Sequence, residues 1–288
     1  MNTASHRFTV GSFQCFAVND GTSVYTNPAP TLFPHAPTAE LEQALRAHAI
    51  DPHSWTEWVS DYTCLLIDTG DHRVLVDTGV GHHTPTTGTL IPNLAALGVA
   101  PDDIDTVVLT HGHPDHIGGN LDGEGRLAFP NARFVMWRGE WEHWTTPLER
   151  LRGDPSQHWM HAFALPQLLP LSDRIQTIEH EAELVPGMRA LAAPGHTPGH
   201  MALEIASDGD RLLVLSDTIL HPIHVEHPEW NTTYEMLPEQ AIATRRRLLQ
   251  RAAEQRTLVA AFHLPFPGIG RIVASDRGWH WRPVAPTR

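Results

Sequence analysis

The sequence predicts one layered α/β domain that spans residues 1–288. Short apolar segments rich in β-branched residues alternate with amphipathic segments, and this pattern favours mixed layers over separate helical and strand domains. With 288 residues, of which 41% are hydrophobic and 18% charged, the chain can bury a large core. It contains no run of 18 apolar residues, so we expect neither a membrane-spanning helix nor a membrane partner.

Local composition predicts the individual elements. Clusters of β-branched and aromatic residues predict strands at Phe8–Val18, Tyr62–Asp68, Val74–Asp77, Thr106–Thr110, Arg133–Trp137, Ala202–Ile205, Leu212–Leu215 and Leu258–Phe262. Helical periodicity predicts helices at Ala39–Ala49, Pro92–Leu97, Gly139–Trp144 and Pro238–Gln255. The stretches Asn27–Pro37 and Thr145–Asp173 predict long irregular loops, which are often functional. In the last helix, the run Arg245–Arg247 predicts a solvated face.

The net charge and the number of cysteines limit which binding partners and which cellular location we expect. The chain has 20 Lys and Arg against 33 Asp and Glu, and the resulting formal charge of −13 argues against a nucleic-acid partner, which basic side chains would bind. The segment Met1–Val10 lacks the apolar core of a secretory signal, and the two cysteines cannot form a disulfide framework. We therefore expect a cytoplasmic protein that acts on a small molecule.

The segment His111–His116 carries the strongest chemical signal. It follows the apolar segment Thr106–Thr110 and reads His-Gly-His-Pro-Asp-His. Residues i and i+2 of an extended chain share a face, so His111 and His113 can point into one site. The Asp and His that end the segment open the next turn and can face a second point nearby. Clustered ionisable groups are rarely buried unless they pair or bind metal, so the segment predicts a metal site.

Three further polar residues follow apolar segments, at positions where α/β proteins collect their site residues. His196 lies in the turn Gly195–His200, Asp217 follows the strand expected at Leu212–Leu215, and His263 comes directly after Phe262. Each residue alone is a weak signal. Their order after the His111–His116 segment is specific, and together they predict a single site built from distant parts of the chain.

With this set of motifs the sequence resembles the metallo-β-lactamase-fold hydrolases over most of its length. Asp77-Thr78-Gly79 and the turn Gly195–His200 belong to the match. The segments Leu127–Ala132 and His263–Gly270 resemble the branch that contains methyl parathion hydrolase and the acyl-homoserine lactonases. The resemblance implies an αββα sandwich, the metallo-β-lactamase fold, with a dinuclear metal site at one edge.

The resemblance also implies roles for single residues. Asp217 would bridge two divalent metal ions, and Asp77 would accept a hydrogen bond from a ligand imidazole and orient it. Zinc suits five imidazoles and two carboxylates, and iron, manganese or cobalt would also fit. Relatives often form homodimers, so a homodimer is a further expectation by analogy. One ion would be bound by His111, His113 and His196, and the other by Asp115, His116 and His263.

The expected chemistry is hydrolysis. Two neighbouring metal ions can share one hydroxide at neutral pH, because a metal lowers the pKa of bound water toward about 7. This hydroxide would attack the carbonyl or phosphoryl centre of an apolar ester, lactone or organophosphate triester, and Asp115 is a candidate to carry the proton to the leaving group. No Gly-x-Ser-x-Gly motif is present, and neither cysteine lies in the motif, so covalent catalysis is not expected.

Candidate substrate contacts are suggested by aromatic residues and by one position at which this sequence differs from the acyl-homoserine lactonases. Phe33, Trp141 and Trp144 are candidates because apolar pockets are often lined by aromatic side chains. Acyl-homoserine lactonases of this fold commonly carry a tyrosine three residues after the bridging aspartate, where this chain has Leu220. The change weakens the quorum-signal interpretation and favours phosphotriesterase-like relatives.

Three other functions remain open at this stage. A glyoxalase II-like thioester hydrolase would use the same ligands. A metal-dependent nuclease also shares the motif, but its substrate should select a basic groove, which the charge of −13 disfavours. A non-catalytic histidine-rich metal binder would have no need for a bridging carboxylate such as Asp217.

Overall fold

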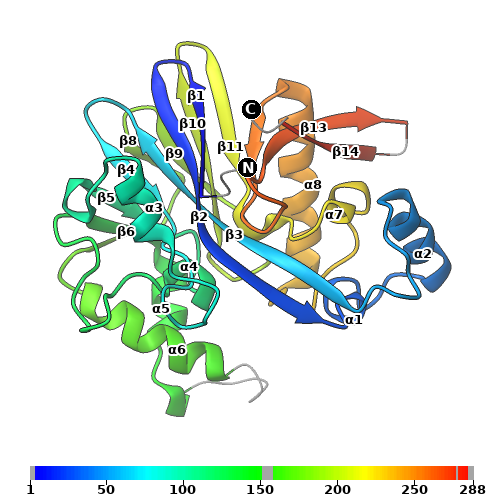
Figure 1. Cartoon of the computed structure of the whole chain (residues 1–288), viewed down its shortest axis with the longest axis horizontal. Helices are drawn as coiled ribbons and strands as arrows, with labels where there is room; N and C mark the ends of the chain where they lie inside the picture. Colours follow the sequence, from blue (N-terminus) through cyan, green and yellow to red (C-terminus); the bar gives the residue numbers. More distant parts are fainter. Residues whose placement is uncertain (1–3, 151–157, 277, 285–288) are drawn as a thin grey trace.

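The computed structural model describes residues 4–150, 158–276 and 278–284, which contain two seven-stranded sheets (Figure 1). The first sheet has the order β1-β2-β3-β4-β5-β6-β7 and the second β14-β13-β12-β11-β10-β9-β8. The strands of the first sheet are β1 (Ser5–Val10), β2 (Phe13–Thr26), β3 (Glu57–Asp68), β4 (Arg73–Val76), β5 (Thr106–Val108), β6 (Arg133–Trp137) and β7 (Ile175–Ile178). Those of the second are β8 (Glu183–Val185), β9 (Met188–Ala192), β10 (Met201–Ser207), β11 (Asp210–Val214), β12 (Leu258–Ala260), β13 (Ile269–Ser275) and β14 (Gly278–Pro283).

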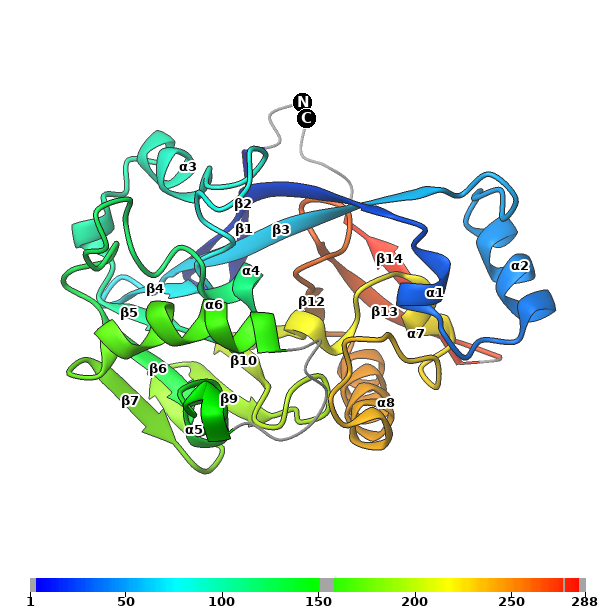
Figure 2. The same ribbon diagram turned by 90° about the horizontal axis from the view of Figure 1, so that it is seen from below.

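Helices cover the outer face of each sheet. The helix α8 (Pro238–Gln255) packs on the second sheet. A smaller group lies at the far end of the long β2–β3 ribbon (Figure 2) and consists of α1 (Ala29–Leu32), α2 (Thr38–Ala47) and α7 (Ile223–Glu226). The helices on the first sheet are α3 (Leu90–Ala96), α4 (Pro114–Ile117), α5 (Arg138–Trp144) and α6 (His158–Leu168).

Alternating side chains of the strands build an αββα sandwich. In β3, Leu66 faces the helices of the first sheet, whereas Leu65 and Ile67 face the second sheet. The central apolar layer joins these residues to Met201 and Leu203 of β10. Because successive residues of a strand point to opposite faces, a fully buried strand needs apolar residues at every position. The fold predicted from the sequence is therefore confirmed.

Most predicted elements are confirmed, and the differences have physical reasons. The segment Phe8–Val18 is two strands, because Gly11 takes a positive φ of 56° and turns the chain between β1 and β2. The irregular loop predicted at Asn27–Pro37 is wrong at Ala29–Leu32, where the short helix α1 begins directly after Pro28, a residue whose fixed φ suits a helix start. The irregular loop predicted at Thr145–Asp173 is wrong over its second half, where α6 forms. This helix is apolar around most of its circumference and contains Pro166, so it lacks the amphipathic signal of a surface helix. Residues 151–157 of that stretch lie outside the described part.

The solvated face predicted for Arg245–Arg247 is wrong for its first residue. Arg245 is 1% exposed, and its guanidinium donates to the Glu235 carboxylate at 2.7 Å and to the carbonyl oxygens of Thr218, Pro228 and Trp230. A buried charge needs such a complete set of partners. Among the described residues, no helix has the length and apolar character needed to cross a membrane.

Candidate metal centre

The predicted ligands meet at the seam between the two sheets. On the first sheet, β5 runs into the His-x-His segment, and α4 begins directly after it. On the second sheet, the loop after β9, the short turn Ser216–Thr218 after β11 and the segment after β12 reach the same place. Distant loops can converge there because all of these strands end at the same edge. The side chains brought together are His111, His113, Asp115, His116, His196, Asp217 and His263.

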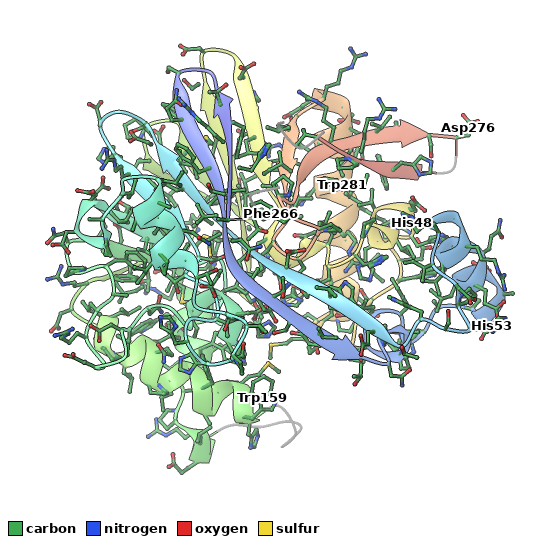
Figure 3. All side chains as sticks on the ribbon, viewed as in Figure 1. His48, His53, Trp159, Phe266, Asp276 and Trp281 are labelled. Carbon is green, nitrogen blue, oxygen red and sulfur yellow. The ribbon has the colours of Figure 1, made fainter. Side chains whose placement is uncertain are left out.

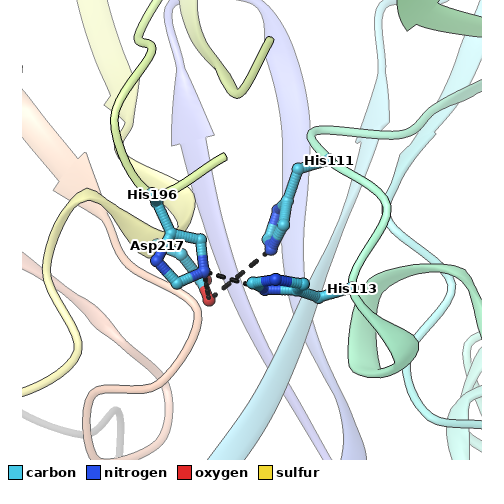
Figure 4. A group of neighbouring side chains, drawn as sticks. All are labelled: His111, His113, His196 and Asp217. Atoms are coloured by element: carbon cyan, nitrogen blue, oxygen red, sulfur yellow. Dashed lines mark hydrogen bonds and ion pairs between the residues drawn. The ribbon is translucent and has the colours of Figure 1, made fainter. Parts of the chain in front are cut away.

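Four of these side chains form a first group (Figure 4): His111, His113, His196 and Asp217. Their ligand-type atoms all lie within 4.8 Å of one another. The Oδ2 atom of Asp217 is 3.4 Å from His196 Nε2 and 3.8 Å from His111 Nε2, while His196 Nε2 is 2.9 Å from His113 Nδ1. Three imidazoles and one carboxylate around one point are a typical donor set for zinc.

Asp217 also belongs to a second group, together with Asp115, His116 and His263. Its Oδ1 atom is 3.2 Å from His116 Nε2, and its Oδ2 atom is 3.0 Å from His263 Nε2. The Oδ2 atom of Asp115 lies 3.3 Å from His263 Nε2. The two groups therefore share one carboxylate, which faces one group with Oδ1 and both groups with Oδ2.

Unpaired buried atoms show that this cluster fits a metal ion. His111 Nε2, His113 Nε2, His116 Nε2, His196 Nδ1 and Asp217 Oδ1 are buried and have no hydrogen-bond partner. Buried polar atoms are rarely left unpaired in a folded protein. Cations bound at the two groups would complete the coordination of several of these atoms, so the donor chemistry fits divalent metal.

Asp77 lies directly behind the cluster. Its Oδ2 atom accepts a hydrogen bond of 2.8 Å from His116 Nδ1, and both of its oxygens accept bonds of 2.8 Å from the Thr110 amide and hydroxyl. Asp77 adopts a positive φ of 61°, and its contacts compensate for this uncommon backbone conformation. The contact fixes the tautomer of His116 so that Nε2 faces the second group.

A second buried carboxylate supports the first group and was not predicted. Glu140 accepts hydrogen bonds from the Gly112 amide at 3.0 Å, the Gly199 amide at 2.8 Å and Trp144 Nε1 at 2.6 Å. It therefore ties the His-x-His segment to the turn that carries His196. A Cβ atom at Gly112 would collide with the Trp144 ring, which explains the glycine between the two histidines. The only local sequence signal is the i, i+4 spacing of Glu140 and Trp144.

Two further contacts behind the cluster were also not predicted from the sequence. The Ser60 hydroxyl is 2.8 Å from His263 Nδ1, and the Asp217 amide donates to His200 Nε2 at 3.2 Å. His200 lies in the predicted turn, but nothing in its spacing separates a ligand from a residue that holds the backbone of one. Ser60 lies in β3, far from the motifs, and gave no signal.

Electrostatics differ between the two groups. Burial lowers the pKa of all three imidazoles in the first group, to about 3 for His113. Burial also opposes charge on His116 and His263, but Asp217 and its neighbouring carboxylates hold the pKa of both above the ordinary value. Although burial opposes its charge, those two imidazoles hold the pKa of Asp217 well below its ordinary value. The first group therefore offers neutral imidazole lone pairs.

A cavity of about 360 Å³ opens onto the cluster, and its wall contains His113, Asp115, His196, Asp217 and His263. Of the four predicted substrate contacts, only Leu220 is part of this wall. Phe33, Trp141 and Trp144 do not line it; they pack in or against the apolar clusters, and Trp144 is bound to Glu140 instead. Trp159, at the start of α6 (Figure 3), lines the cavity and was not predicted.

Comparison with known proteins decides the family. Residues 46–263 match the model of the metallo-beta-lactamase superfamily, which covers more than half of the chain. The chain belongs to the metallo-beta-lactamase superfamily. An N-acyl homoserine lactonase of Bacillus thuringiensis is 27% identical over 225 residues, which are 69% of this chain and 80% of the relative. A probable metallo-hydrolase of Mycobacterium tuberculosis is 29% identical over 189 residues, 54% of this chain and 56% of that protein.

Solved structures of this superfamily superpose over nearly the whole chain. AidC, a dizinc quorum-quenching lactonase in complex with a product, has a TM-score of 0.90 at 26% identity and covers 100% of both chains. The hydrolase AbOPH has a TM-score of 0.88 at 25% identity over 99% of both chains. Together with the His/Asp cluster, these relatives show that the protein is a metal-dependent hydrolase, as the sequence predicts.

Proposed function

We propose that this hydrolase uses two divalent metal ions, most simply zinc, to hydrolyse apolar carboxylic esters and lactones. The observation that carries the proposal is the pair of donor groups joined by Asp217. The curated and structural relatives include lactonases, and AidC is a dizinc enzyme, which supports both the metal and the substrate class. Organophosphate triesters are the second candidate, because Leu220 places an apolar side chain on the cavity wall.

The protein residues divide the work of this reaction. The two ions, when bound, supply a water of lowered pKa and polarise the substrate. His111, His113 and His196 would bind one ion, Asp115, His116 and His263 the other, and Asp217 both. Asp77 fixes the ring of His116 through the 2.8 Å bond to its Nδ1 atom.

Asp115 is the proposed proton carrier. Its side chain is 19% exposed, lines the cavity and lies 3.3 Å from His263 Nε2. Burial raises the pKa of Asp115, although His116 and His263 oppose this shift. Its place on the cavity wall beside His263 is where a proton would pass from the attacking water to the leaving oxygen.

Metal content and a substrate panel together test the proposal. We expect about two zinc ions per chain by elemental analysis, and hydrolysis of N-hexanoyl-homoserine lactone and p-nitrophenyl butyrate that a chelator abolishes and zinc restores. Methyl paraoxon tests the second candidate, and a lactoylglutathione thioester tests the glyoxalase II-like alternative. One ion per chain at full activity would contradict the dinuclear mechanism, and cleavage of the thioester alone would contradict the substrate class.

Domain organisation and location are part of the same proposal. We propose that residues 1–288 form one domain, since both sheets contribute to the cluster. A cytoplasmic location is supported by Cys15 and Cys64, which are free and buried. A homodimer remains a prediction that sedimentation of the metal-loaded protein can check.

A further inference from the structure

All three tyrosines of the chain line the cavity that opens onto the cluster. Tyr25 lies near the end of β2, Tyr62 lies in the partner strand β3, and Tyr234 lies in the loop before α8. Three separate parts of the chain thus bring a phenol to one cavity. The rest of its wall combines apolar side chains such as Val80 and Phe163 with polar ones such as Ser23 and Thr84.

Two of these phenols are held in place next to the second donor group. Tyr25 Oη and Tyr62 Oη are 2.9 Å apart, and the Tyr62 ring stands edge-on to His263 with a centroid distance of 5.7 Å. The Tyr25 ring packs on Trp58 at 5.2 Å. The bond between the phenols uses one of their two hydrogens, so the pair keeps one hydrogen for a ligand.

The position of Tyr62 indicates where the remaining hydrogen can be used. Either oxygen can be the donor in the bond between Tyr25 and Tyr62, so either phenol can keep the free hydrogen. The Tyr62 ring contacts His263 of the second donor group, and both phenols line the cavity. The pair can therefore present its free hydrogen from Tyr62, next to that group.

The loop that carries Tyr234 is held in place by contacts of the two residues that follow it. The adjacent Glu235 carboxylate pairs with the buried Arg245 guanidinium at 2.7 Å. The amide of Met236 donates to the carbonyl of His196 at 3.0 Å. The third phenol thus lies on a segment that is held both to α8 and to the turn that carries His196.

We propose that Tyr62, positioned by Tyr25, donates a hydrogen bond to the substrate oxygen that gains negative charge when the carbonyl is attacked at the cluster. The inference rests on the proposed hydrolysis and adds a catalytic residue to it. A fixed donor in a site largely shielded from water stabilises such charge strongly. Leu220, buried in the wall of the same cavity, has no polar atom on its side chain for this purpose.

Phenylalanine variants test the inference, because they remove one oxygen and keep the ring. In zinc-loaded Tyr62→Phe we expect kcat for p-nitrophenyl butyrate to fall by about 100-fold, the effect typical of a lost oxyanion donor, with KM changed less than threefold. Tyr25→Phe should lower kcat less, because Tyr62 keeps its own hydroxyl. The matched control is Val24→Ala, whose side chain is 56% exposed on the opposite face of β2, and its activity should match the wild type.

Two further measurements separate catalysis from structure. The double variant Tyr25→Phe/Tyr62→Phe should be no slower than Tyr62→Phe, because Tyr25 acts only through its partner. Zinc content and the melting temperature should be the same in all variants. A kcat within twofold of wild type in Tyr62→Phe would overturn the inference, as would a loss explained by missing zinc. A wild type that hydrolyses no ester or lactone would instead refute the proposed function.

Discussion

The two donor groups share Asp217 but differ in charge and in readiness for a cation. The first group has three imidazoles and one carboxylate, and burial keeps its rings neutral. The second group has two imidazoles and two carboxylates, and its carboxylates raise the pKa of His116 and His263. In the metal-free protein, the second group therefore carries protons that a metal ion must displace, whereas the first does not.

Because of this difference, we expect one group to bind its metal ion more tightly and the other to lie closer to the reacting atoms. Protons compete with a metal ion for imidazole lone pairs, so a group with lowered pKa values loses its ion only at lower pH. The first group is suited to retain its ion. The second group contains Asp115, the proposed proton carrier, and has Tyr62 beside His263, so we expect it to meet the reacting oxygens.

The largest effect is expected where the two groups meet. Asp217→Asn removes the shared carboxylate, so both groups should bind metal more weakly and kcat should fall by more than about 100-fold, the upper range for residues that only support a ligand. Metal content and kcat measure this. Asp208→Asn is the control, because Asp208 lies in a tight turn with a positive φ of 48° that asparagine also adopts. Full metal content in Asp217→Asn would break the assignment of a shared ligand.

Acid should empty the groups in sequence. As the pH falls through about 6.5, the ordinary pKa of imidazole, protons should displace the ion of the second group first, because the pKa of His116 and His263 is raised. The ion of the first group should leave at lower pH, because the pKa of its imidazoles is lowered. Zinc content after dialysis at each pH shows the two steps. Release of both ions in one step would contradict the proposed difference in metal affinity between the two groups.

Asp77 and Glu140 should act on different groups. Asp77→Asn disturbs the contact to His116, and Glu140→Gln disturbs the clamp on the Gly112 amide. Loss of such supporting contacts typically costs 10- to 100-fold in metal affinity. Competition with a chelator should show that the first variant weakens the more weakly bound ion and the second variant the more tightly bound one. The opposite pairing would contradict the order of affinity.

The smallest effect is expected for Trp144. Trp144→Phe removes the indole donor from Glu140 and should lower the free energy of unfolding by about 1–3 kcal/mol, because a buried carboxylate loses a partner. Activity should fall less than tenfold, the lower limit for supporting residues. Urea unfolding and kcat check both expectations, with Trp141→Phe in the same helix as control. An altered KM with unchanged stability would make Trp144 a substrate contact instead.

The cluster could be predicted from the sequence because its chemistry is encoded locally. The ligands lie within a few residues of the ends of apolar segments, and four of them, His111, His113, Asp115 and His116, fall within six consecutive residues. The layered fold could be predicted for the same reason, since the period of apolar residues is a local property. The strands β7, β8, β13 and β14 were not predicted. β7 and β8 have only four and three residues, and β13 and β14 pair with each other at one end of the second sheet, where strand form depends on the neighbouring strand.

The surroundings of the cluster depend on contacts between distant segments. Tyr25 and Tyr62 meet only because β2 and β3 pair in register, with Tyr25 opposite Trp58. Glu140 reaches two loops that lie 28 and 59 residues away. Arg245 looks like part of a solvated run until the loop before α8 folds over it. Such contacts leave no trace in local composition, and the three aromatic residues chosen as substrate contacts, Phe33, Trp141 and Trp144, all lie outside the cavity wall.

Because the cluster lies across the seam, any metal ion bound there would also link the two sheets. Each donor group contains side chains from both sheets. An ion bound there would therefore connect the two sheets, which otherwise pack against each other mainly through an apolar layer. Ligands that bind only the native state stabilise it in proportion to the logarithm of their free concentration. Metal supply in the cell would then set the lifetime of the enzyme against proteolysis as well as its rate.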